Sequence, residues 1–119
     1  MKHVLAVDDN PTNLTLVRET LKDDFKVSVV TSGELCLKFL EKKDPDIVLL
    51  DYCMPGMDGP ETLGHIMESY GSKLPVIIMT ALADQDMLDE CRQIGAVGCI
   101  PKPFSKELIV SAITDVIGK

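Results

Sequence analysis

The sequence of 119 residues contains few aromatic side chains, with no tryptophan, two tyrosines and three phenylalanines. Proteins that carry a flavin usually stack aromatic rings against it, so this composition argues against a flavin-dependent electron carrier. Positive charge is also scarce, because 12 basic residues against 19 acidic residues give a formal net charge of −7. Such a balance repels phosphate backbones and anionic lipids, so we expect no direct binding to nucleic acid or to a membrane.

Closely spaced cysteines and long apolar runs are missing as well. The four cysteines, at positions 36, 53, 91 and 99, form no C-x-x-C pair of the kind found in zinc or redox sites. Free thiols in a reducing compartment fit this spacing best. The apolar run that begins at Val4 is too short for the core of a signal peptide and far too short to span a bilayer. We therefore expect a cytoplasmic protein.

Short apolar runs alternate along the chain with stretches of helical spacing. The runs at residues 4–7, 27–30, 47–50, 76–79 and 97–100 are typical of strands buried on both faces. Between them apolar residues recur every three or four positions, as at Leu14, Val17 and Leu21. This alternation predicts an α/β fold with a doubly wound, five-stranded parallel sheet. No linker or repeat divides the chain, so we expect one domain over residues 1–119.

Residues that start and stop helices agree with this alternation. Asn10 and Pro11 can serve as the N-cap and the first residue of the first helix. The pattern Thr31-x-x-Glu34 is typical of a capping box before the second helix, and Gly95 suits the end of the fourth. These residues predict where three of the helices begin or end.

Polar side chains stand where the apolar runs end. In chain order they are Asp8 and Asp9, Asp51, Thr80 and, just after the last run, Lys102. In an open parallel sheet the ligand site lies outside the carboxyl ends of the strands. We therefore expect three carboxylates, a hydroxyl and an ammonium to meet in one crevice.

These side chains can support phosphoryl transfer. Three neighbouring carboxylates repel one another unless a cation lies between them, and Mg²⁺ is typically held by one or two carboxylates together with a phosphate. Lys102 and Thr80 could donate hydrogen bonds to the phosphoryl oxygens. Asp51 could then act as the nucleophile and form an acyl phosphate.

Four short motifs, in this order, resemble the CheY-like receiver domains of two-component response regulators. They are VDDN at 7–10, LDYCMPGMDG at 50–59, MTA at 79–81 and PKPF at 101–104. The resemblance covers essentially the whole chain. It implies a (βα)5 fold with strand order 2-1-3-4-5, which is the flavodoxin-like arrangement.

The resemblance also implies a signalling function. Asp51 would take a phosphoryl group from a sensor histidine kinase or a histidine phosphotransfer protein, while Lys102 and Thr80 contact the phosphoryl oxygens. A cis peptide is implied between Lys102 and Pro103. The domain would catalyse only its own phosphorylation and dephosphorylation, and it would signal to a downstream protein or a fused output domain.

A magnesium site is implied at the same place. Asp9 would bind Mg²⁺ directly and Asp8 mostly through water. Asp51 would contribute its carboxylate and Cys53 its backbone carbonyl, so the side chain at position 53 is free to vary.

Three positions depart from the usual pattern of this family. Cys99 stands where family members carry a tyrosine or phenylalanine that changes pose on phosphorylation. We expect Thr80 and the loop after it still to move toward the phosphoryl group and to alter the surface near the fourth helix and fifth strand. Cys53 and Leu82 cannot easily activate a water molecule, so a long-lived phosphorylated state is expected.

Three other functions fit parts of the pattern. A phosphatase of the haloacid dehalogenase type also phosphorylates an aspartate, but it needs a carboxylate two residues later, where this chain has Cys53. A flavodoxin-type carrier would bring the flavin phosphate to Asp8 and Asp9, whose charges oppose it. A receiver that only docks to partners remains open, although the five key side chains are present.

Overall fold

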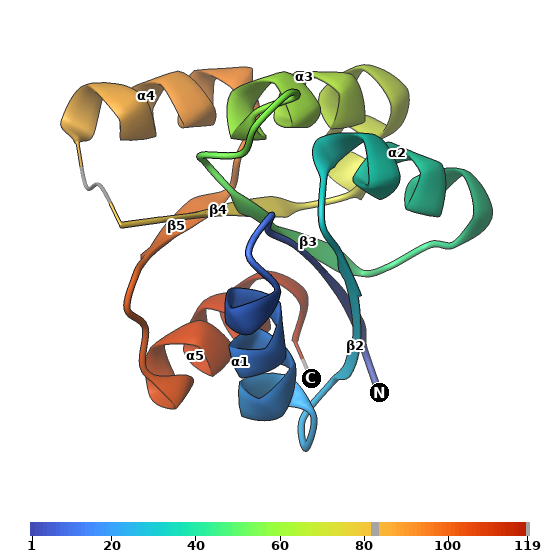
Figure 1. Ribbon diagram of the computed structural model, residues 1–119, viewed down its shortest axis with the longest axis vertical. Helices are drawn as coiled ribbons and strands as arrows, with labels where there is room; N and C mark the ends of the chain where they lie inside the picture. Colours follow the sequence, from blue (N-terminus) through green and yellow to red (C-terminus); the bar gives the residue numbers. More distant parts are fainter. Residues whose placement is uncertain (82–83, 119) are drawn as a thin grey trace.

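The computed structural model describes residues 1–81 and 84–118 and shows a parallel sheet between two layers of helices (Figure 1). The strands are β1 (His3–Val7), β2 (Lys26–Val30), β3 (Ile47–Asp51), β4 (Val76–Thr80) and β5 (Gly98–Pro101). The helices are α1 (Pro11–Leu21), α2 (Gly33–Lys42), α3 (Gly59–Tyr70), the 3-10 helix η1 (Gly71–Lys73), α4 (Gln85–Ile94) and α5 (Lys106–Ile117). In the described residues the strands form one parallel sheet in the order β2-β1-β3-β4-β5. The predicted fold class and strand order are confirmed.

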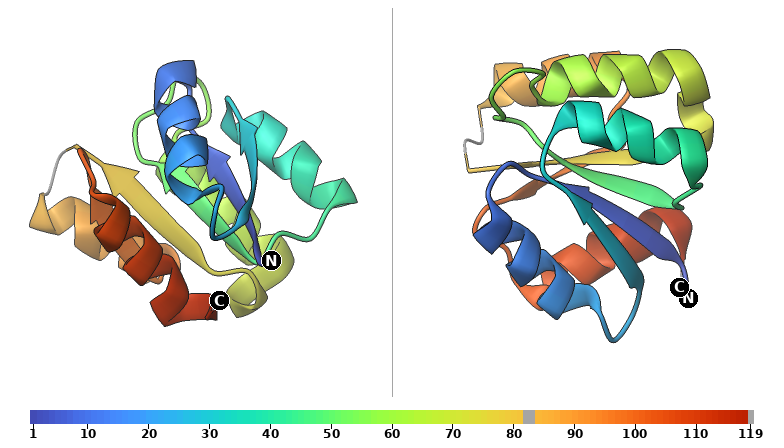
Figure 2. Two further views of the ribbon diagram at one scale, coloured as in Figure 1. Left: turned by 90° about the horizontal axis from the view of Figure 1, so that it is seen from below. Right: turned by 45° about the vertical axis from the view of Figure 1, so that its right-hand side comes forward.

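The sheet separates two hydrophobic cores. Helices α2, α3 and α4 cover one face, and α1 and α5 cover the other (Figures 1 and 2). In β3, Val48 and Leu50 belong to the first core, whereas Ile47 and Leu49 belong to the second. Because a strand between two helical layers is buried on both sides, its sequence is apolar throughout rather than alternating.

Two helix ends lie where the sequence predicts them. Asn10 is the N-cap of α1, because its Oδ1 accepts a hydrogen bond of 2.9 Å from the amide of Thr12, and Pro11 is the first helical residue. Helix α4 ends at Gly95, whose φ of 141° strains any residue with a Cβ atom. Within residues 1–81 and 84–118, every helix falls short of the length and apolar character required of a bilayer span.

The capping box predicted at Thr31 and Glu34 is wrong by one residue. Ser32 is the N-cap of α2, and its hydroxyl accepts a hydrogen bond of 3.1 Å from the amide of Leu35. Serine and threonine are both good caps, so local sequence does not distinguish the two neighbours. Gly33, the first helical residue, lies so close to Thr62 that a side chain at position 33 would clash.

Strand boundaries also differ slightly from the prediction. The sequence predicts that β3 ends at position 50 and β4 at position 79. Each strand extends one residue further in the structure, so Asp51 and Thr80 are the last strand residues. Strand β5 begins at Gly98, one residue later than predicted, and Val97 before it is half-exposed. Asp51 and Thr80 are therefore held by the sheet itself.

The start of α3 is packed directly against the end of β3. Gly59 donates its amide to the carbonyl of Tyr52 at 3.0 Å. A Cβ atom at position 59 would lie 2.5 Å from the carbonyl oxygen of Asp51 and 2.8 Å from the Cα of Tyr52. Only glycine allows this approach, and it brings the first turn of α3 next to Asp51.

We expect Gly59→Ala to destabilise the protein by about 2 kcal/mol, because the new methyl group would overlap main-chain atoms that cannot move freely. Gly64→Ala is the matched control in the same helix, since among the described residues, apart from the adjacent helix backbone, no atom lies within 4 Å of a Cβ atom there. Alanine favours a helix interior, so Gly64→Ala should stabilise by about 0.5–1 kcal/mol. Urea denaturation measures both changes, and two stabilising substitutions would contradict the tight contact at Gly59.

Candidate functional site

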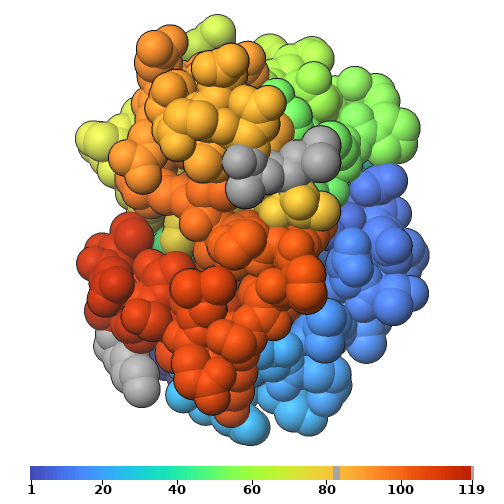
Figure 3. All heavy atoms as spheres, turned by 90° about the vertical axis from the view of Figure 1, so that its left-hand side faces the viewer, coloured from blue at the N-terminus to red at the C-terminus, as the bar shows by residue number. Residues whose placement is uncertain are grey.

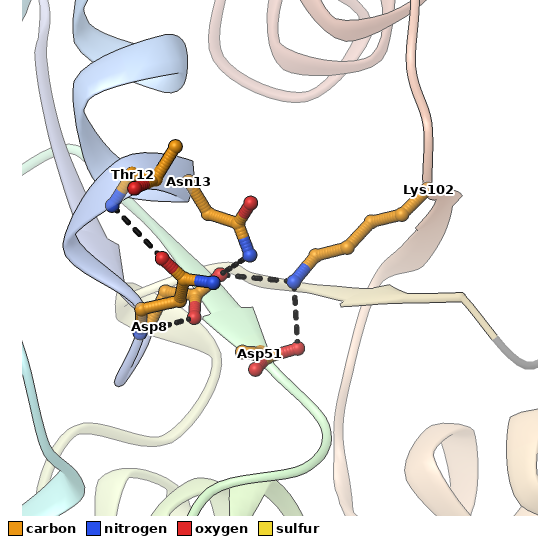
Figure 4. Close-up of polar contacts among 6 residues, drawn as sticks. Asp8, Thr12, Asn13, Asp51 and Lys102 are labelled. Carbon is orange, nitrogen blue, oxygen red and sulfur yellow. Dashed lines mark hydrogen bonds and ion pairs between the residues drawn. The ribbon is translucent and has the colours of Figure 1, made fainter.

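Of the predicted site residues, Asp8, Asp51 and Lys102 come together at the carboxyl edge of the sheet (Figure 4). Asp8 and Asp9 follow β1, whose Val7 is paired with Leu50 of β3, and Asp51 ends β3. Strand β4 ends at Thr80, which is paired with Pro101 immediately before Lys102. The parallel register therefore places residues that are far apart in sequence at one edge.

The Lys102 side chain joins two of the carboxylates. Its Nζ donates a hydrogen bond of 2.9 Å to Oδ2 of Asp8 and one of 3.0 Å to Oδ1 of Asp51 (Figure 4). The amide of Lys102 donates to the carbonyl of Thr80 at 2.8 Å, which ties the segment after β5 to the end of β4. The peptide between Lys102 and Pro103 is cis, as the resemblance implies.

Asp8 is also held by the first turn of α1. Its Oδ1 accepts a hydrogen bond of 2.9 Å from the amide of Asn10, and its Oδ2 accepts one of 3.2 Å from Nδ2 of Asn13 (Figure 4). Sequence reasoning treated Asn10 only as a helix cap and did not identify Asn13. The sequence feature that could have identified Asn13 is its position in the first turn of α1, close behind the aspartate that follows β1.

The charges in the crevice act on one another. Burial raises the pKa of the Asp51 carboxyl above its ordinary value; the nearby Lys102 opposes this change, and Asp8 adds to it. For Lys102, burial acts to lower the pKa, but hydrogen bonds to Asp8 and Asp51 outweigh burial and the pKa is raised. Lys102 therefore stays charged at neutral pH beside a carboxylate that is more basic than usual.

Three carboxylates are close enough to share a metal ion. Asp8, Asp9 and Asp51 each offer an oxygen, and these oxygens lie within 4.8 Å of one another. Asp9 is exposed, whereas Asp8 and Asp51 are buried. An all-oxygen set that is open to solvent on one side fits Mg²⁺, which keeps several waters.

The other predicted site residues are placed as follows. Thr80 is buried, with 3% of its surface exposed. Cys53 lies in the exposed loop two residues after Asp51, and the role of its carbonyl as a ligand stays a prediction. Cys99 is partly buried on β5, in register with Ile78 of β4. Leu82 lies outside the described residues.

Comparisons with known proteins point to one family. The model of the response regulator receiver domain family matches residues 4–114. The chemotaxis protein CheY of Halobacterium salinarum is 32% identical over 117 residues, which cover 98% of this chain and 97% of that protein. Sporulation initiation phosphotransferase F of Bacillus subtilis is 36% identical over 111 residues, with 92% and 89% covered. The solved structure of the Vibrio cholerae chemotaxis protein CheY4 has a TM-score of 0.91 at 30% identity, with 98% of each chain covered.

Substitutions at the two ends of the ion pair should change stability in opposite directions in metal-free buffer. We expect Asp51→Asn to stabilise by about 1 kcal/mol, because it removes a buried charge from an acidic crevice. Lys102→Met should destabilise by about 2 kcal/mol, because it leaves buried carboxylates without their cation. Chemical denaturation in the presence of a chelator measures both values.

The effect of Asp51→Asn should depend on pH. Because the pKa of Asp51 is raised in the folded protein, the wild type gains stability relative to the variant as pH falls through that pKa toward the ordinary aspartate value. The difference in the free energy of unfolding between the variant and the wild type should be largest at about pH 7 and should decrease toward about pH 4. A difference that widens on acidification would contradict the burial of an ionised Asp51.

Proposed function

This chain belongs to the response regulator receiver domain family of two-component signal transduction, and we propose that it accepts a phosphoryl group on Asp51. The donor would be a sensor histidine kinase or a histidine phosphotransfer protein in the cytoplasm. The observation that carries the proposal is the position of Lys102, whose ammonium lies 3.0 Å from the Asp51 carboxylate at the open edge of the sheet. A cation at this place can receive the charge of an incoming phosphoryl group.

Each residue of the crevice has a separate part in the transfer. An oxygen of Asp51 attacks phosphorus, and the bond from phosphorus to the donor nitrogen breaks, with its electron pair leaving on the nitrogen. Lys102 and Thr80 hydrogen-bond the transferred oxygens.

Magnesium would be held by Asp9, Asp8 and Asp51, with the backbone carbonyl of Cys53 as a further ligand. The close approach of the three carboxylate oxygens supports this assignment. When bound, Mg²⁺ offsets the negative charge of the carboxylates and of the phosphoryl group. Asp8 already has Lys102, Asn10 and Asn13 as partners, so it orients the site while the exposed Asp9 supplies the accessible ligand.

Phosphorylation would change the partners of Lys102. In the unphosphorylated chain this ammonium is shared between Asp8 and Asp51. A phosphoryl group on Asp51 brings more negative charge than the carboxylate it replaces, so Lys102 would turn toward it, and Thr80 at the end of β4 would follow. The surface near α4 and β5 would then signal to a downstream protein or fused output domain.

The proposed activity is signalling by one domain over residues 1–119, without turnover of small phosphate esters. A phosphatase that uses an aspartyl phosphate needs an acid–base carboxylate close to the nucleophile. Two residues beyond Asp51 this chain carries Cys53, in an exposed loop. A thiol at that place supplies no equivalent carboxylate.

Incubation with acetyl phosphate and Mg²⁺ should add one phosphoryl group to the wild type, measured by intact mass. Asp51→Asn should abolish the adduct, because the amide is a far weaker nucleophile. Asp58→Asn is the matched control: Asp58 caps α3 through a hydrogen bond of 2.9 Å to the amide of Glu61, and asparagine caps equally well. This control should be phosphorylated like the wild type. An unchanged adduct on Asp51→Asn would contradict the assignment.

Mg²⁺ alone should stabilise the folded chain, by about 2.7 kcal/mol when its concentration is a hundred times the dissociation constant. Asp9→Asn should remove most of this gain, because it deletes the exposed carboxylate of the set. The gain should also shrink on acidification, because protons compete for Asp51, whose pKa is raised. Thermal unfolding with and without Mg²⁺ measures the effect, and full stabilisation of Asp9→Asn would place the metal elsewhere.

A further inference from the structure

An apolar pocket of about 250 Å³ lies beside the acidic crevice. It lies between α1 and the segment that follows β5, whose surfaces border one another (Figure 3). Its lining is mostly apolar and includes Leu16, Val17, Met79 and Phe104. A closed apolar cavity of about 150 Å³ is large enough for benzene, so this space is large enough for a short hydrocarbon chain.

The pocket and the crevice share two residues. Asp8 and Lys102 line the pocket, and the same Lys102 ammonium lies 3.0 Å from Asp51. The Lys102 side chain therefore contacts both the apolar pocket and the phosphoryl acceptor Asp51. Leu16 adds to this wall although 55% of its surface is exposed to water, so apolar surface is available to an incoming group.

We propose that this pocket receives the acyl group of small apolar acyl phosphates and makes them better phosphoryl donors to Asp51 than acetyl phosphate. The inference rests on the proposed function of Asp51. A bond forms between an Asp51 oxygen and phosphorus, and the bond from phosphorus to the bridging oxygen breaks. The acyl group leaves as a carboxylate with that electron pair, so no proton has to move.

Charge and size decide which acyl groups fit. The leaving carboxylate is released beside the Lys102 ammonium, which favours its departure. A second carboxylate on the acyl chain would enter a mostly apolar pocket that Asp8 also lines, so succinyl phosphate should gain nothing. Butanoyl phosphate carries two more methylenes than acetyl phosphate, and both can lie on the apolar wall.

The test compares rates of Asp51 phosphorylation by acetyl, butanoyl and succinyl phosphate, measured by intact mass in the presence of Mg²⁺. Complete burial of a methylene raises an equilibrium constant about fourfold. Because the pocket is open to solvent on one side, we expect butanoyl phosphate to react about fivefold faster than acetyl phosphate. Succinyl phosphate should react no faster than acetyl phosphate.

Two variants separate the pocket from the intrinsic reactivity of the donors. Leu16→Gln removes an exposed apolar wall and should reduce the butanoyl-to-acetyl ratio to below about twofold. Leu35→Gln is the matched control, because Leu35 is also exposed, at 44%, but belongs to α2 on the other face of the sheet. The control should keep the ratio of the wild type. An equal ratio in all three proteins would overturn the inference.

A second readout does not depend on phosphoryl transfer. 2-Oxopentylphosphonate, an unreactive analogue of butanoyl phosphate, should bind several-fold more tightly than 2-oxopropylphosphonate, the analogue of acetyl phosphate. Its binding should shift the methyl resonances of Leu16 and Val17. Equal affinities, or shifts confined to other methyl groups, would overturn the inference.

The outcomes distinguish this inference from the proposed function. If acetyl phosphate labels Asp51 but chain length has no effect, the pocket inference is wrong and the phosphoacceptor assignment stands. If no donor labels Asp51, both are wrong. If Leu16→Gln slows only transfer from a phosphohistidine protein, the pocket is a contact surface for that protein and the acyl-group inference is overturned.

Discussion

The Lys102 ammonium between Asp8 and Asp51 is the interaction on which the crevice depends. Both carboxylates are largely buried, with 6% and 8% of their surfaces exposed, and two adjacent buried negative charges without a cation would be costly. Lys102 offsets part of that cost in the unphosphorylated chain, although the pKa of Asp51 remains raised. The same ammonium lies where the negative charge of a phosphoryl group would arrive. Lys102 therefore stabilises the buried carboxylates of the unphosphorylated chain and would also stabilise the group transferred in the proposed reaction.

The sheet positions this ion pair more than any local segment does. Asp8 and Asp51 come from the ends of strands that are adjacent in space but separated in sequence by α1, β2 and α2. Lys102 reaches them because its own amide is bonded to the carbonyl of Thr80, which fixes the segment after β5 to the end of β4. Gly59 completes the arrangement by allowing α3 to begin against the main chain of Asp51.

Much of this could be predicted from the sequence. The fold class and the meeting of Asp8, Asp51 and Lys102 were predicted correctly from apolar runs that end in polar residues, because the carboxyl ends of parallel strands share one edge of the sheet. The strand order was also predicted correctly, but from the resemblance to receiver domains. Details that depend on neighbouring segments were less predictable. The cap of α2 lies at Ser32 instead of Thr31, because serine and threonine are both good caps and local sequence does not distinguish the two neighbours.

The sequence by itself determined the order of the elements, the polar residues at the strand ends and the net negative charge, because these depend on residue type and short spacing. Tertiary structure alone decided that Asn13 supports Asp8 and that an apolar pocket adjoins Lys102. The pocket lies beyond sequence reasoning for a physical reason. Its walls come from separate segments, and Leu16 lies off the buried stripe of Leu14, Val17 and Leu21, so its partners exist only once α1 and the segment after β5 lie side by side.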